Sequence, residues 1–72
     1  MIFNVGDVVF VSHAYAIGRG AGNKKWVGKK GVVVERNSYK KMFVEMFCYK
    51  VLIDGVQLNL DEREVSDRED GS

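Results

Sequence analysis

Two short apolar runs, each with a glycine near its start, frame a basic and glycine-rich stretch in the first half of the chain. The runs are residues 6–11, Gly-Asp-Val-Val-Phe-Val, and residues 30–35, Lys-Gly-Val-Val-Val-Glu. They are too short for helices, and their β-branched residues favour strands. Residues 12–29 contain four glycines, so we expect a long flexible loop between the two strands.

The next apolar run, residues 42–53, is longer and ends in a turn signal. Its first half also tolerates a helix, but residues 49–53 alternate as a strand does. An Asp-Gly pair follows at 54–55 and predicts a hairpin, because both turn residues must accept a positive φ. The returning strand is residues 56–60, and we expect an earlier turn at residues 37–40, Asn-Ser-Tyr-Lys.

A capping pattern follows these strands. Asp61 precedes Glu64 by three residues, which is the spacing of a capping box and predicts one tight turn. Val65 then begins a last short strand. Residues 66–72 contain no apolar side chain, so we predict a domain over residues 1–65 and a flexible acidic tail over 66–72.

Five short strands with glycine-marked turns predict an all-β fold, a small barrel or sandwich rather than a helical bundle. Closing the sheet would also remove exposed edges that a valine-rich sheet must protect. The predicted core consists of Val9, Val11, Val33, Tyr49, Val51, Ile53, Leu58, Leu60 and Val65, with Phe3 or Val5 closing one end.

The composition argues against catalysis. The chain of 72 residues has one cysteine and one histidine, so it can form neither an internal disulfide nor a cysteine-rich zinc site. His13 has no cysteine or paired carboxylate beside it, and Cys48 lies in an apolar run. We expect a surface histidine and a buried structural thiol. The sequence therefore predicts no metal site, no cofactor and no enzymatic activity.

No run approaches the roughly 18 apolar residues of a membrane span. The N-terminus also lacks the basic and apolar regions of a secretory signal. With the lone cysteine, these features predict a cytoplasmic protein without a membrane partner.

The net charge of +1 conceals a strong segregation of charge. Residues 12–50 hold nine lysines and arginines against two acids, whereas residues 51–72 hold seven acids against two arginines. Such asymmetry favours a basic surface that faces a partner. Solvated charges that neutralise each other are the alternative explanation.

The basic loop is the first candidate binding surface. Its cations could neutralise phosphates, and Tyr15 and Trp26 flank it and could stack on bases. Basic residues interleaved with aromatics suit RNA more than DNA. The alternative for Trp26 is packing over one end of the barrel. The predicted nucleic-acid-binding residues are Arg19, Lys24, Lys25, Trp26, Lys29 and Lys30.

Residues 6–11 and 26–35 resemble the KOW motif, in which a Gly-Asp-x-Val-x-Val strand and a Gly-x-Val strand flank a loop. Residues 50–65 are similar to the end of the KOW domain of the bacterial transcription factor NusG and its relatives. The resemblance implies a small SH3-like barrel of about five strands, here with a long first loop. KOW domains occur in ribosomal proteins and elongation factors and bind RNA, DNA or protein. A nucleic acid or a nucleoprotein complex is thus the expected partner.

A second aromatic and basic cluster lies in residues 39–47. Methionine and aromatic side chains are favoured at interfaces, and the run is too apolar for so small a chain to bury completely. A pair of core strands is the alternative. The predicted protein-binding residues are Tyr39, Met42, Phe43 and Met46. They support a competing hypothesis, a protein-interaction module or small inhibitor that docks on a larger machine, with homodimerisation also possible.

Overall fold

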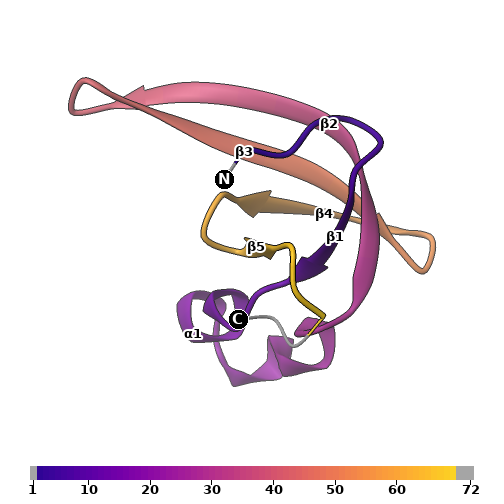
Figure 1. The fold of residues 1–72 in the computed structure, drawn as a ribbon. Coiled ribbons are helices and arrows are strands. Elements are labelled where there is room, and N and C mark those ends of the chain that lie inside the picture. Colours follow the sequence, from indigo (N-terminus) through magenta and orange to yellow (C-terminus); the bar gives the residue numbers. More distant parts are fainter. Residues whose placement is uncertain (1, 70–72) are drawn as a thin grey trace.

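The computed structural model describes residues 2–69 and contains one antiparallel sheet of five strands that curls around the core (Figure 1). The strand order is β4-β3-β2-β1-β5, so the last strand returns to pair with the first. This confirms the predicted small all-β, barrel-like fold of five strands. The elements are β1 (Val8–Val11), α1 (Ala14–Arg19), η1 (Ala21–Trp26, a 3₁₀ helix), β2 (Lys30–Lys41), β3 (Val44–Ile53), β4 (Val56–Asp61) and β5 (Val65–Ser66).

The core is built mainly from alternate residues of the strands. The buried apolar residues are Phe3, Val9, Val11, Tyr15, Val33, Tyr49, Val51, Ile53, Leu60 and Val65. Most of the predicted core is thereby confirmed, and Phe3 rather than the exposed Val5 closes one end. Leu58 is only partly buried. The Tyr49 hydroxyl accepts a hydrogen bond from the Phe3 backbone N–H at 3.1 Å, which satisfies both groups inside the core.

The connection between β1 and β2 is helical, so the prediction of a flexible loop is wrong. α1 and η1 occupy most of it, and Gly20, with a φ of 101°, separates them. Tyr15 is 5% exposed and enters the core from α1, which anchors the connection to the barrel. Because a buried tyrosine ring cannot stack on a base, the base-stacking role predicted for Tyr15 is wrong.

One predicted turn is confirmed and another is wrong. Asp54 and Gly55 have φ values of 51° and 78°, as the Asp-Gly hairpin requires. By contrast, residues 37–40 are not a turn but continue β2, where Asn37 and Ser38 pair with Cys48 and Phe47 of β3. Cross-strand pairing here outweighs the turn preference of asparagine and serine.

The reversal of the chain comes instead at Met42 and Phe43, which have φ values of 50° and 68°. β2 and β3 thereby form a long two-stranded ribbon that projects beyond the barrel (Figure 1).

The end of the chain is more closely integrated than the sequence indicated. Asp61 and Glu64 form the predicted capping box, with each carboxylate accepting the backbone N–H of the other residue. Ser66 is buried and pairs with Phe10, so the predicted boundary after residue 65 falls inside β5. Residues 70–72 of the predicted tail lie outside the described residues. No helix in the described part of the chain could cross a membrane.

Candidate nucleic-acid interface

Arg19 is held by an internal ion pair at the end of α1. Its guanidinium donates to both carboxylate oxygens of Glu64 at 2.9 and 3.0 Å, and also to the Asn59 carbonyl. The guanidinium carbon lies 4.8 Å from the centroid of the Tyr15 ring. The hydrogen bond to Glu64 raises the pKa of Arg19 above its ordinary value, although burial opposes this shift. Arg19 therefore ties α1 to the turn between β4 and β5.

Glu64 has two structural roles, of which the sequence predicted only one, the capping box. Its side chain is 8% exposed and serves the capping box and Arg19 together. The capping spacing identified the Glu64 carboxylate, but Arg19, the cation that it binds, lies 45 residues away in the sequence. No local pattern in the sequence links the two residues.

Two exposed lysines lie in the last turn of η1 beside the only tryptophan. Lys24 and Lys25 are exposed, whereas Trp26 is half-buried and packs against the core. The Lys25 ammonium group lies 5.8 Å from the Trp26 ring centroid, within the range of a cation–π contact. Trp26 thus packs against the core and is also partly open to solvent next to a cation.

Lys29 and Lys30 follow η1 at the start of β2, and both are exposed. The Lys29 ammonium group lies 3.3 Å from the Asp54 carboxylate, and both side chains are largely exposed. An exposed pair of this kind contributes at most about 1 kcal/mol, so competing ions displace it readily. Together, Lys25, Trp26, Lys29 and Asp54 line a hollow of about 260 Å³.

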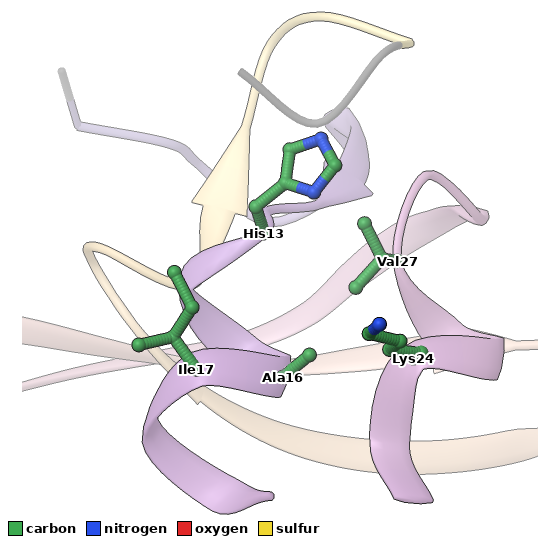
Figure 2. A pocket seen from close by; sticks show the side chains of 5 residues that line it. All are labelled: His13, Ala16, Ile17, Lys24 and Val27. Atoms are coloured by element: carbon green, nitrogen blue, oxygen red, sulfur yellow. The ribbon is translucent and has the colours of Figure 1, made fainter. Parts of the chain in front are cut away.

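A second, larger hollow of about 430 Å³ lies between α1 and η1 (Figure 2). Ala16, Ile17 and Val27 provide its apolar lining, and His13 and Lys24 complete it. His13 is exposed just before α1, as expected of a surface histidine.

The four residues of the second predicted surface come together on the ribbon. Tyr39 and Met46 lie directly opposite each other in the β2–β3 register, so they share one face. Met42 and Phe43 form the turn at its end and are 85% and 103% exposed. These side chains therefore add to the surface of the molecule and not to its core.

Residues 2–69 contain no group of three or more histidine, cysteine or acidic side chains that could hold a metal ion. Cys48 is a free, half-buried thiol on β3, less buried than the sequence suggested.

Comparison of the chain with family models, curated proteins and solved structures finds no match. The resemblance to KOW domains therefore rests on the motif residues alone.

Proposed function

We propose that this chain is a non-enzymatic nucleic-acid-binding protein that contacts RNA, alone or in a nucleoprotein complex, through the surface around η1. The contact residues are Lys24, Lys25, Trp26, Lys29 and Lys30. The observation that carries the proposal is the hollow that Trp26 lines together with Lys25 and Lys29, where the Lys25 ammonium group lies close to the indole ring. Arg19 is left out, because Glu64 already binds its guanidinium.

The chemistry of this hollow suits a single-stranded nucleic acid. Aromatic side chains provide stacking surfaces for bases, and ammonium groups neutralise the neighbouring phosphates. A phosphate can also replace Asp54 as the partner of Lys29, because their ion pair is exposed. The KOW resemblance supports the same function, and the lone cysteine suits a cytoplasmic location.

Binding of a short single-stranded RNA of mixed sequence, measured by fluorescence anisotropy, tests the proposal. Affinity should fall steeply between about 50 and 200 mM salt, because each neutralised phosphate of a single strand contributes about −0.7 to the logarithmic salt slope. Lys25→Glu should weaken binding strongly and reduce the magnitude of that slope.

Arg63→Glu is the matched control. It changes the net charge equally, but Arg63 lies on the exposed turn after β4, beside Ile17 and not beside Trp26. If both variants lose affinity equally, the attraction is non-specific and the assigned surface is wrong. The absence of binding by the unmodified chain at low salt would refute the function itself.

A further inference from the structure

The end of the β2–β3 ribbon combines two features that the fold does not explain. Met42 and Phe43 both adopt left-handed φ values, a conformation that favours asparagine and glycine in hairpin turns. Both side chains are also almost fully exposed, so neither contributes to the packing of the core. Exposed apolar groups on a strained turn are typical of contact sites.

The ribbon presents this turn away from the rest of the sheet. Residues 37–41 of β2 pair only with residues 44–48 of β3, and β3 meets β4 only from Cys48 onward. The turn therefore lies beyond the last residues that a third strand supports, as Figure 1 shows at the far end of β2. The whole Phe43 side chain is therefore accessible to a partner.

Two cations immediately precede the turn. Lys40 lies opposite Glu45 in the register, whereas Lys41 lies opposite Val44 and has no carboxylate across from it. In the described part of the chain, neither lysine forms an ion pair within 4 Å. A fully exposed aromatic ring thus lies two residues from a lysine that forms no ion pair, and at Trp26 an aromatic ring likewise neighbours a lysine.

We propose that the ribbon end, residues 40–44, is a second nucleic-acid contact, in which the Phe43 ring stacks on an unpaired base and Lys41, which has no acidic residue across from it, faces the adjacent phosphate. The inference rests on the proposed function and specifies the kind of RNA bound, a structured RNA with a single-stranded loop. Unpaired loop bases are accessible to aromatic side chains, whereas bases inside an RNA helix are not.

A hairpin RNA carrying 2-aminopurine in its loop tests the contact, with a fully paired RNA of the same stem as the reference. Phe43→Ala should weaken loop binding by roughly 5- to 150-fold, the range for loss of one stacked base, and should abolish the change in 2-aminopurine fluorescence. Because the substitution removes no cation, the salt slope should stay unchanged. Phe43→Trp should restore binding.

Two further variants sharpen the result. Phe43→Leu keeps an apolar tip without an aromatic ring, and Val5→Ala removes another exposed apolar side chain, which is 63% exposed before β1. Val5→Ala should bind normally and Phe43→Leu should bind weakly. Full binding by Phe43→Leu or Phe43→Ala would overturn the stacking contact and favour a ribbon that docks on protein. If Lys25→Glu nevertheless binds RNA weakly, the proposed function stands without the ribbon contact. If the unmodified chain binds neither RNA, both proposals fail.

Discussion

Replacing Gly31 with alanine is expected to destabilise the barrel by about 1–3 kcal/mol, the usual range for overpacking a core. An added Cβ would lie 2.5 Å from Cγ1 of Ile53 and 2.7 Å from both Cγ1 of Val51 and the Leu52 carbonyl oxygen. The side chains can shift, but Leu52 is held in the sheet by its register with Val32. Urea unfolding followed by circular dichroism measures the loss.

Gly18→Ala is the matched control for this variant. Gly18 lies in α1, and an added Cβ there would meet nothing within 4 Å. Alanine in a helix is more favourable than glycine by about 1 kcal/mol, so this variant should be as stable as the unmodified chain or slightly more stable. Equal stability of the two variants would show that Gly31 is not at a close contact between β2 and β3.

The second large effect is expected at the ribbon end, and it has the opposite sign. The double variant Met42→Asn and Phe43→Gly should raise the free energy of unfolding by about 1–2 kcal/mol, because it relieves left-handed φ values at two non-glycine residues. The same variant should lose the loop contact assigned to Phe43. Thermal unfolding and the 2-aminopurine assay measure the two effects.

The control for this prediction removes the same side chains without relieving the backbone. Met42→Ala and Phe43→Ala together keep residues that disfavour a positive φ, so stability should not rise. A double variant with asparagine and glycine that is no more stable than this control would contradict the strain at the turn.

The fold was predictable where short-range patterns determine it. Alternation located the core of β3, the Asp-Gly pair located its hairpin with β4, and the spacing of Asp61 and Glu64 located the final turn. In each case the decisive residues are neighbours in the sequence, so no knowledge of the tertiary structure is needed.

The remaining features depend on contacts between distant residues. α1 forms because Tyr15 enters the core and Arg19 reaches Glu64, neither of which a local pattern reveals. The ribbon passes through Asn37 and Ser38 because their pairing with β3 overrides a local turn preference.

The candidate site was predictable in composition but not in arrangement. The sequence identified its lysines and Trp26 as a group, yet it could not separate Arg19, whose charge Glu64 neutralises, from Lys24 and Lys25. It also placed Met42 and Phe43 on one interaction surface without locating them at a turn.

A titration of the ¹⁵N-labelled chain with short single-stranded RNA at low salt, followed by amide chemical shifts, tests the central claim most directly. The account predicts that the largest shifts occur in residues 24–30, together with the Trp26 indole N–H, and that they vanish as salt is raised. Unchanged signals in residues 24–30 at the highest RNA concentration would contradict the proposal, whether or not other residues shift.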